Sequence, residues 1–338
     1  MAEPRWALTL PFAGIRLADH EPFVRQAEAC GYDDLWTGET AGPDGFTPLA
    51  LAAAWTERMR LGTGVVNPFT RGPAVLAQHA AALADASGGR FVLGLGSSSN
   101  VIVERWNRIP FDKPLTRVRE AVEALRPVLA GERGPGGFKL ETPPEHPVPI
   151  YVAALRDRML RLGGEIADGT FVNFLPLSAA AHVIEQVRAG EQRGGRVPGE
   201  SDVVCRFFCV PQPIEEGLPV ARLMFAAYGT VPVYEAFFRG LGWGERIDPM
   251  IEAWRAGDRK LALERVPDDL IREIFVFGSP ERQRERLGEF AAAGITTLVL
   301  MPVCPPEELG ELISRLGPSG AGDGRARRAA PRASGGSG

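Results

Sequence analysis

Polar side chains that could bind a ligand follow a glycine-broken strand early in the chain. Segment 61–66 is apolar apart from one threonine and contains two glycines. Glycines weaken a strand, so we expect them to allow close approach of a ligand to the backbone or an unusual backbone conformation. An amide at Asn67, a hydroxyl at Thr70 and a cation at Arg71 come next, at the carboxyl end of the strand, where α/β proteins build their sites. The pattern predicts a wall against which a flat cofactor lies.

The candidate for acid–base chemistry is a carboxylate at the end of the preceding strand. Glu39 belongs to the sequence Trp36-Thr-Gly-Glu39-Thr40, and a carboxylate at the tip of a barrel strand faces the site, where it can orient a substrate or relay a proton. The alternative is that Glu39 hydrogen-bonds backbone groups of a neighbouring loop. We adopt the functional interpretation and take Glu39, Thr40 and Trp36 as the candidate catalytic residues.

Three consecutive hydroxyls, at Ser97, Ser98 and Ser99, follow another predicted strand. The sequence Gly94-Leu-Gly96 before them begins like a dinucleotide fingerprint. The rest of the fingerprint is missing, because three serines and Asn100 follow Gly96 and the next acidic residue, Glu104, comes too early. We therefore expect a shallow shelf of hydroxyls and backbone amides at the mouth of the fold.

A turn between a strand and a helix, at 152–158, could hold a phosphate. Backbone N–H groups at a helix N-terminus attract anions, and Arg156, Arg158 and Arg161 place guanidinium groups along the same helix. Arg158 and Arg161 are equally well explained as a solvated basic face. The turn itself is therefore the stronger indication of a phosphate site.

Cysteines and histidines give no support for a metal site. The four cysteines form neither a Cys-x-x-Cys pair nor a Cys/His cluster, which argues against zinc and against a disulfide framework and fits a reducing cytoplasm. None of the four histidines has metal-ligand spacing or lies beside a nucleophile, so His79 and His182 are interpreted as packing or surface residues. No metal ligands are predicted, and Ser/His/Asp hydrolysis has no support.

Composition bounds the class of protein and its partners. With 338 residues, 45% hydrophobic and 24% charged, the chain can bury the core of one large α/β domain. A formal net charge of −4 gives no reason to expect nucleic acid or a membrane surface as partner, so we expect a small molecule. No cationic segment followed by a long apolar run opens the chain, and no apolar stretch nears 20 residues, which predicts a cytoplasmic, soluble protein.

The elements that must position these side chains alternate between strands and helices. About eight strand signals favour a closed (β/α)₈ TIM barrel over an open sheet of fewer strands. The predicted strands are 6–10, 35–37, 60–66, 91–95, 150–153, 170–174, 203–210 and 297–301, with a short apolar element at 275–277. The predicted helices are 22–29, 48–57, 73–86, 115–130, 156–166, 179–190, 280–293 and 306–316.

The alternation breaks at a helical insertion over about 215–274, near the seventh strand. Its aromatic residues are either core or a lid over the barrel mouth for an apolar or ring-shaped substrate. They are Tyr228, Tyr234, Phe237, Phe238, Trp243 and Trp254. We thus expect a single domain over 1–316, and a disordered tail over 317–338, where Gly, Ala, Ser and Arg show no apolar periodicity.

Taken together, several motifs resemble the bacterial luciferase-like flavin oxidoreductase superfamily. Within it they are most similar to the coenzyme F420-dependent branch, which includes methylenetetrahydromethanopterin reductase. The combination spans residues 6–316 and is specific, although each piece alone is not. The motifs are Leu35-Trp-Thr-Gly-Glu39, Leu61-Gly-Thr-Gly-Val-Val-Asn-Pro-Phe-Thr-Arg-Gly-Pro73, Ala86-Ser-Gly-Gly-Arg-Phe-Val-Leu-Gly-Leu-Gly96, Val148-Pro-Ile-Tyr-Val-Ala-Ala154, Gly164-Glu-Ile-Ala-Asp-Gly169, Gly278-Ser-Pro-Glu281 and Ala293-Gly-Ile-Thr-Thr297.

The resemblance implies a (β/α)₈ barrel with an insertion near the seventh strand, a flavin or deazaflavin at the carboxyl ends of the strands, and a homodimer. A cis peptide on the third strand of the F420 branch corresponds to Gly64-Val65. The deazaflavin ring would pack on these two residues, with contacts from Asn67 and the three serines, and its phosphate on the turn after the fifth strand. The implied cofactor-binding residues are Thr63, Gly64, Val65, Asn67, Arg71, Ser97, Ser98, Ser99, Ala154, Leu155 and Arg156.

The implied activity is hydride transfer between C5 of F420 and a small organic substrate. Thr40 stands where several relatives have histidine. The glucose-6-phosphate dehydrogenase relatives have a carboxylate after the fourth strand, and it is replaced here near Ser99. Sugar-phosphate oxidation is therefore not expected. One alternative is an FMN-dependent luciferase-like monooxygenase, in which a base such as Glu39 assists. A second is a non-catalytic flavoprotein subunit, which the superfamily also contains.

Overall fold

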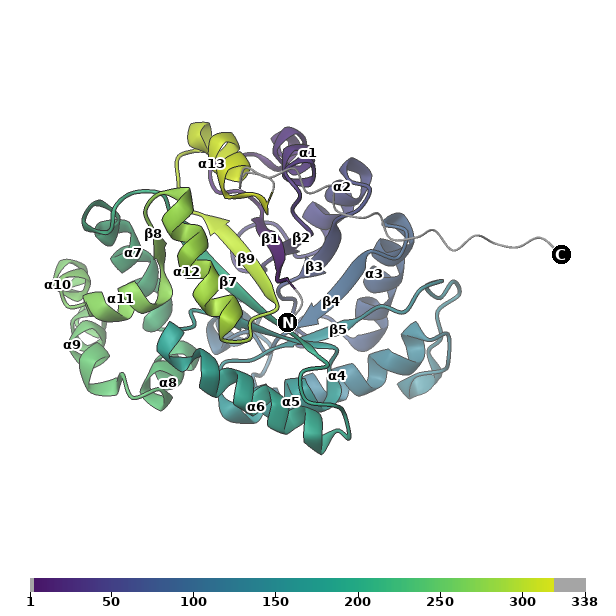
Figure 1. Cartoon of the computed structure of the whole chain (residues 1–338). Coiled ribbons are helices and arrows are strands. Elements are labelled where there is room, and N and C mark those ends of the chain that lie inside the picture. Colours follow the sequence, from purple (N-terminus) through teal and green to yellow (C-terminus); the bar gives the residue numbers. More distant parts are fainter. Residues whose placement is uncertain (1–2, 319–338) are drawn as a thin grey trace.

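Eight parallel strands close into a barrel in the computed structural model, which describes residues 3–318 (Figure 1). Each strand pairs with its neighbours in sequence, and β9 closes the ring by pairing with both β7 and β1. A two-residue strand, β8 (Val276–Phe277), extends the end of β7. The (β/α)₈ barrel predicted from the sequence is thereby confirmed. The barrel strands are β1 (Arg5–Leu10), β2 (Asp34–Thr37), β3 (Arg60–Thr63), β4 (Phe91–Leu95), β5 (Ile150–Ala153), β6 (Gly169–Asn173), β7 (Asp202–Val210) and β9 (Thr297–Pro302).

Helices surround the barrel as an outer layer (Figure 1). Five of them, α1, α2, α3, α4 and α12, have proline in the first turn, where its fixed φ suits a helix and its missing N–H costs nothing. The outer helices are α1 (Glu21–Ala29), α2 (Thr47–Trp55), α3 (Pro73–Ala86), α4 (Pro114–Leu129), α5 (Asp157–Ile166), α6 (Ala180–Arg193), α12 (Pro280–Ala292) and α13 (Leu309–Leu316). Short helical turns are η1 (Leu17–Asp19), η2 (Val101–Trp106), η3 (Pro135–Gly137), η4 (Leu177–Ala179) and η5 (Pro306–Glu308).

The insertion after β7 is helical, as the fold prediction states. Its helices are α7 (Ile214–Gly229), α8 (Pro232–Gly240), α9 (Gly244–Arg255), α10 (Arg259–Glu264) and α11 (Asp268–Ile274). In Figure 1 they gather beside β7 and β8, on the left of the view. The two interpretations of its aromatic residues both hold, for different side chains. Phe237 and Phe238 are buried in the insertion's own core, whereas Tyr228 and Tyr234 are half-buried and line a cleft described below.

The inside of the barrel is packed with side chains, which explains the two glycines of β3 and the residue after it. Trp36 lies among Tyr151 and Phe171 in the barrel interior. A Cβ at Gly62 would lie 2.4 Å from two ring atoms of Trp36, and one at Gly64 would lie 2.7 Å from the ring of Phe171. Close approach of a ligand, predicted as one use of these glycines, is therefore wrong for Gly62: its missing side chain makes room for an indole.

The backbone at the end of β3 is unusual in the way that the resemblance implies. The peptide bond between Gly64 and Val65 is cis. The strand was expected to continue to Val66 but ends at Thr63. Pairing with the next strand resumes beyond the cis bond, where Val66 N donates to Gly94 O at 3.0 Å and Val66 O accepts from Gly96 N at 2.9 Å.

A network of charged side chains closes the amino-terminal end of the barrel. The buried Asp34 carboxylate pairs with Arg5 and, at 2.8 Å, with Arg60, which also reaches Asp202 at 3.3 Å. Burial alone would raise the pKa of Asp34, but the two guanidinium groups outweigh it and hold the pKa below its usual value. This network stabilises the amino-terminal end of the barrel and lies far from the strands' carboxyl ends.

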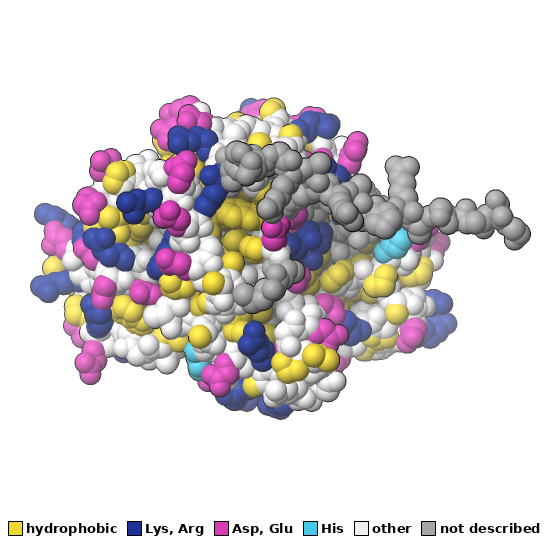
Figure 2. Space-filling view, viewed as in Figure 1, with side chains coloured by type: hydrophobic (Ala, Val, Ile, Leu, Met, Phe, Trp, Pro, Cys, Tyr) yellow, Lys and Arg dark blue, Asp and Glu magenta, His cyan; other side chains and the backbone are white. Residues whose placement is uncertain are grey.

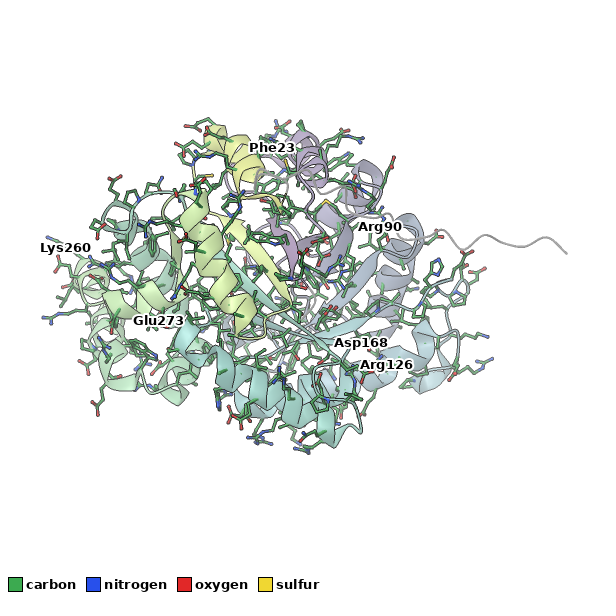
Figure 3. All side chains as sticks on the ribbon, viewed as in Figure 1. Phe23, Arg90, Arg126, Asp168, Lys260 and Glu273 are labelled. Carbon is green, nitrogen blue, oxygen red and sulfur yellow. The ribbon has the colours of Figure 1, made fainter. Side chains whose placement is uncertain are left out.

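A second ion pair ties the helix layer to the same end of the barrel. Arg126 on α4 lies 3.2 Å from Asp168, whose carboxylate also accepts from the backbone N–H of Ile150 at 2.8 Å (Figure 3). Acidic and basic side chains are interspersed over the face of the molecule drawn in Figure 2. Within residues 3–318, no helix has the length and apolar character needed to cross a membrane. Most of the tail predicted over 317–338 lies outside the described residues.

Candidate active site

A large cleft opens at the carboxyl ends of the strands. Its volume is about 1390 Å³, above the roughly 300–1,000 Å³ usual for a single small-molecule site. The segments after β2, β3, β4 and β5 line one side, and β7 with the insertion helices α7 and α8 lines another. The cleft has room for a cofactor and a substrate together.

Most of the site residues predicted from the sequence meet in this cleft. They are Glu39, Thr40, Gly64, Val65, Asn67, Ser97, Ser98, Ser99, Ala154, Leu155 and Arg156. Three others, Trp36, Thr63 and Arg71, do not line it.

Trp36 and Thr63 lie beneath the cleft, and both side chains are completely buried. The indole Nε1 of Trp36 donates to Asp34 Oδ2 at 3.4 Å. The Thr63 hydroxyl is used within the sheet, since it accepts from Gly94 N at 2.8 Å and donates to Gly94 O at 2.9 Å. Neither side chain can touch a ligand in the cleft. The structure therefore corrects the expected catalytic role of Trp36 and the expected cofactor contact of Thr63. Alternation along the strands points Trp36 into the packed barrel interior and Thr63 to the opposite face of the sheet, away from the cleft in both cases.

Glu39 and Arg71 form a two-bonded ion pair at the edge of the cleft. Arg71 Nη1 donates to Glu39 Oε2 at 2.7 Å and Nη2 donates to Oε1 at 2.6 Å. The hydrogen bond with Glu39 raises the pKa of Arg71. Glu39 Oε1 also accepts from the backbone N–H of Gly45 at 3.2 Å, which is the loop contact that the alternative interpretation describes. Glu39 therefore orders the 39–45 loop as well as facing the cleft, and Arg71 holds its carboxylate in place.

Asn67 is oriented by its own turn. Its Oδ1 accepts from the backbone N–H groups of Phe69 at 3.1 Å and Thr70 at 2.9 Å, and from the Thr70 hydroxyl at 3.1 Å. These bonds hold Oδ1 against the 67–70 turn and leave Nδ2 without an acceptor among residues 3–318. Asn67 can offer this donor to the edge of a ligand.

The serine shelf lies between β4 and η2. Ser98 adopts a left-handed backbone with φ of 61°. The Ser97 hydroxyl contacts Ser98 O at 3.5 Å, and the Ser99 hydroxyl accepts from Ile102 N at 3.4 Å at the start of η2. Both are long hydrogen bonds, so these hydroxyls can turn toward a ligand in the cleft at little cost.

The turn after β5 leads into the N-terminus of α5. The Arg156 carbonyl accepts from Met159 N and Leu160 N, both at 2.9 Å, so the helix starts directly behind it. The first N–H groups of a helix have no partner within the helix and suit an anion. Asp157 in the first turn pairs with His182 at 2.9 Å, and His182 lines the cleft. This histidine, interpreted from the sequence as a packing or surface residue, is exposed and stands at the rim.

Four polar side chains lie on the opposite side of the cleft; sequence reasoning missed Asn173 and Arg206, whereas Tyr228 and Tyr234 were among the aromatic residues considered for a lid. Asn173 ends β6, Arg206 lies within β7, Tyr228 belongs to α7 and Tyr234 to α8. One signal was available, because Arg206 is the only charged residue in the otherwise apolar segment 203–210. A lone cation inside a barrel strand indicates a side chain directed at the strand ends or the interior.

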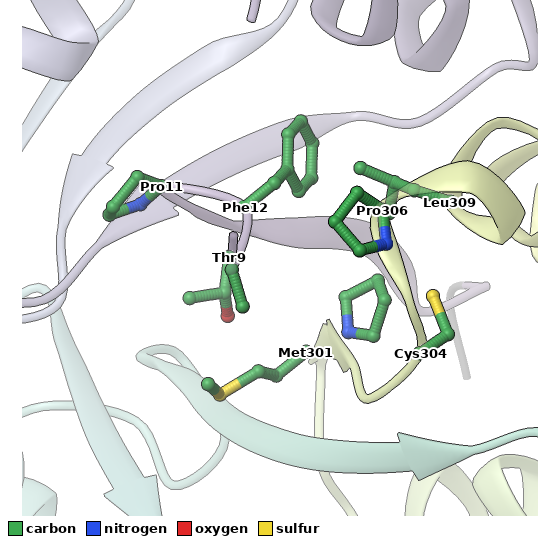
Figure 4. A pocket seen from close by; sticks show the side chains of 9 residues that line it. Thr9, Pro11, Phe12, Met301, Cys304, Pro306 and Leu309 are labelled. Atoms are coloured by element: carbon green, nitrogen blue, oxygen red, sulfur yellow. The ribbon is translucent and has the colours of Figure 1, made fainter. Parts of the chain in front are cut away.

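A second hollow, near the ends of β1 and β9, is too small for a cofactor. It measures about 20 Å³ and is lined by Thr9, Phe12, Met301 and Cys304, among others (Figure 4). A space of this size holds about one water molecule. Burial raises the pKa of Cys304 to about 11, so its thiol is protonated and unreactive at neutral pH. Across the part of the chain that the structure describes, no three Asp, Glu, His or Cys side chains group so as to hold a metal ion.

Comparisons with known proteins agree with the geometry. Residues 6–297 match the luciferase-like monooxygenase family. A Mycobacterium tuberculosis protein to which coenzyme F420-dependent oxidoreductase activity is ascribed is 31% identical over 312 residues, covering 83% of this chain and 90% of its own. The 5,10-methylenetetrahydromethanopterin reductase of Methanolobus tindarius is 29% identical over 299 residues, covering 85% and 91%.

A solved structure shows the same fold. The coenzyme F420-dependent tetrahydromethanopterin reductase of Methanopyrus kandleri superposes with a TM-score of 0.79 at 23% identity, covering 94% of this chain and 98% of its own. The resemblance noted in the motifs is therefore confirmed, and the chain belongs to the luciferase-like monooxygenase family.

Proposed function

We propose that the protein is an F420-dependent oxidoreductase that transfers a hydride between the deazaflavin C5 and a small organic substrate. The observation that carries this proposal is that most of the predicted cofactor-binding residues meet in one cleft. Relatives whose names include coenzyme F420 or methylenetetrahydromethanopterin reductase cover most of the chain and support the choice of cofactor.

The residues in the cleft fit a deazaflavin. Gly64 and Val65 give a small apolar patch suited to a flat ring, and the Asn67 amide stands beside it. A Cβ at Gly38 would lie 3.6 Å from both the Gly64 carbonyl and Arg206 Nη1, so the absence of a side chain keeps this part of the cleft open. Arg156 and the N-terminus of α5 suit a phosphate.

The chemistry supplied by bound F420 is hydride transfer at C5. The chain supplies position, polar contacts and exclusion of water. The Glu39–Arg71 pair fixes a charged group at the edge of the cleft, and its bidentate geometry holds both side chains still. Burial raises the pKa of Tyr234 to about 12, so its hydroxyl keeps its proton at neutral pH and can donate it in a hydrogen bond.

The decisive experiment titrates the purified apoprotein with F420 and with FMN, following fluorescence, and then measures oxygen uptake by the reduced complexes. We expect F420 to bind and its reduced complex to leave oxygen unconsumed. Tight binding of FMN without binding of F420, together with oxygen uptake, would instead identify the FMN-dependent monooxygenase. Cofactor binding without turnover of any compound in a substrate panel would favour a non-catalytic subunit.

A matched pair of variants tests where the cofactor lies. Arg156→Gln should weaken F420 binding about tenfold or more, because a charge-assisted hydrogen bond to the phosphate is lost. Arg282→Gln removes the same charge from an exposed position on α12 that does not line the cleft, and should leave the affinity unchanged. Equal effects from both variants would mean that Arg156 acts only through net charge.

We also propose a homodimer, as the family resemblance implies. Light scattering on the eluting protein gives its mass in solution. A value matching one 36.4 kDa chain at micromolar concentration would contradict this proposal.

A further inference from the structure

The side chain of Arg206 crosses the base of the cleft and bonds to three other strand segments. Its Nε donates to the Thr9 hydroxyl at 3.2 Å, and its Nη2 donates to Thr37 O at 3.3 Å and Gly64 O at 2.9 Å. The guanidinium carbon also lies 5.2 Å from the ring centre of Phe171. The orientation of this guanidinium is thus set by four neighbours, all of them neutral.

The positive charge of Arg206 has no carboxylate to balance it within residues 3–318. Within the described part of the chain, every acceptor that Arg206 uses is a hydroxyl or a backbone carbonyl, and no ion pair includes it. Burial lowers the pKa of Arg206, and the phenols of Tyr228 and Tyr234 make the largest contributions in the opposite direction. Arginine stays charged in proteins even so. Arg206 is half-buried at the base of the cleft. A cation withdrawn from water is normally paired, and this one is not paired by the described chain.

Unused hydrogen-bond donors cluster around this charge. Arg206 Nη1 makes no hydrogen bond to residues 3–318, although all five N–H groups of a guanidinium are donors. The Tyr234 oxygen accepts from Asn173 Nδ2 at 3.0 Å, which leaves its own O–H without an acceptor in the described chain. The Tyr228 ring lies 5.5 Å from that of Tyr234, and both line the cleft with Arg206.

We propose that Arg206, Tyr228 and Tyr234 form an oxyanion-binding subsite that selects a substrate carrying a carboxylate. This inference rests on the proposed function, because it assigns the other side of the cleft to the cofactor. An anionic oxygen placed here would pair the unbalanced cation and accept from the free donors at once.

The position of the subsite assigns the oxyanion to the substrate. Its residues come from β7, α7 and α8, whereas the residues predicted to hold the cofactor come from the segments after β3, β4 and β5. An oxyanion on the deazaflavin ring has the same chemistry and is the competing source. The two sources differ in what the loss of Arg206 changes: substrate affinity or cofactor affinity.

Calorimetric titration of the full-length protein with benzoate and with benzamide tests the proposal. These probes have the same shape and differ in charge, and they are titrated at constant ionic strength with and without saturating F420. We expect benzoate to bind at least about tenfold more tightly than benzamide, in both conditions, because charge-assisted hydrogen bonds replace neutral ones. Equal affinity of the two probes for the wild-type protein would overturn the proposal without any variant.

Variants then locate the preference. Arg206→Gln should bring benzoate to within about twofold of benzamide and leave F420 affinity nearly unchanged, while Arg206→Lys should keep part of the preference because it keeps the charge. Arg282→Gln, the exposed control on α12, should keep all of it. A preference that survives Arg206→Gln would refute the subsite, and a tenfold loss of F420 affinity in that variant would assign the oxyanion to the cofactor. Thermal melting by circular dichroism confirms that each variant is folded.

The outcomes also separate this inference from the proposed function. If the wild-type protein fails to bind F420, the proposed function fails, yet the benzoate preference of the unloaded protein remains measurable. If F420 binds and the preference is absent, only the subsite fails.

Discussion

Replacing Gly62 by alanine tests whether this glycine serves packing or a ligand. Gly62 has no left-handed backbone, so alanine can adopt its conformation, and the cost is purely steric. The new Cβ would lie 2.4 Å from Trp36 Cε3 and Cζ3, about 1 Å inside ordinary van der Waals contact. The indole cannot easily retreat, because it is completely buried with Tyr151 and Phe171 at ring-centre distances of 5.6 and 5.4 Å.

The expected loss is set by two opposing contributions. Overpacking of a well-packed core costs about 1–3 kcal/mol, and Gly→Ala returns about 0.4–1 kcal/mol by restricting the unfolded chain. We expect the free energy of unfolding to fall by about 1–2 kcal/mol, measured from urea midpoints at unchanged m-value. Gly288→Ala on the exposed face of α12, where a Cβ meets nothing within 4 Å, is the matched control and should be stabilising.

A double-mutant cycle identifies the clashing partner. Trp36→Phe removes Cε3 and Cζ3, the two ring atoms nearest to the new Cβ, so the double variant should lose less stability than the sum of the two single variants. An unchanged urea midpoint in Gly62→Ala, combined with weaker F420 binding, would refute the packing explanation and restore close approach by a ligand. Additive losses in the cycle would show that the strain falls on a residue other than Trp36.

Three further outcomes follow from contacts elsewhere in the barrel. Asp34→Asn should cost about 3–5 kcal/mol at neutral pH, because it leaves two guanidinium groups without their buried partner. The pKa of Asp34 is lower in the folded protein than its value of about 3.9 in the unfolded chain. The stability that the carboxylate contributes is therefore complete above about pH 3.9 and is lost as the pH falls through the folded-state pKa. Urea midpoints of variant and wild type should thus converge on acidification. Thr63→Val should lower stability by about 1–3 kcal/mol, since Gly94 loses its two hydrogen bonds with the Thr63 hydroxyl. F420 affinity should be unchanged in the fluorescence titration. Glu39→Gln should slow turnover and leave F420 affinity nearly intact. Equal slowing in Arg71→Met would show that the ion pair acts by positioning the carboxylate. Unchanged turnover in Glu39→Gln would leave Glu39 only a structural role.

The repeating elements could be predicted from the sequence because their signals are local. Proline at the first turn and a pair of glycines after the last turn mark both ends of α3, which was predicted over its observed range. The strands at 91–95 and 150–153 were also predicted over their observed ranges, since turn residues flank both. The end of β3 was overestimated by three residues, because apolar character continues through Val66 although the ladder stops at Thr63.

The site was predictable where strand ends alone define it, and missed where distant contacts do. Asn67 and the serines at 97–99 follow strands directly, so the carboxyl-end rule places them in the cleft. Trp36 has the same kind of position in sequence but points into the interior, where it meets a glycine from the neighbouring strand. Arg206 bonds to residues 142, 169 and 197 positions away, and no local pattern contains such contacts.

Arg206 also links the two sides of the cleft physically. It begins on the side that includes the insertion helices and ends at the carbonyl of Gly64, the residue on which the cofactor ring is proposed to pack. A ligand oxygen that pairs with Nη1 would therefore pull on the same guanidinium whose Nη2 holds that carbonyl. The guanidinium that pairs with the substrate also holds the Gly64 backbone, so binding of the two ligands can be coupled while F420 affinity alone stays nearly unchanged. A lysine in its place would keep the charge but lose the second arm. We accordingly expect Arg206→Lys to separate the two roles, with more loss in cooperative binding of benzoate and F420 than in binding of benzoate alone.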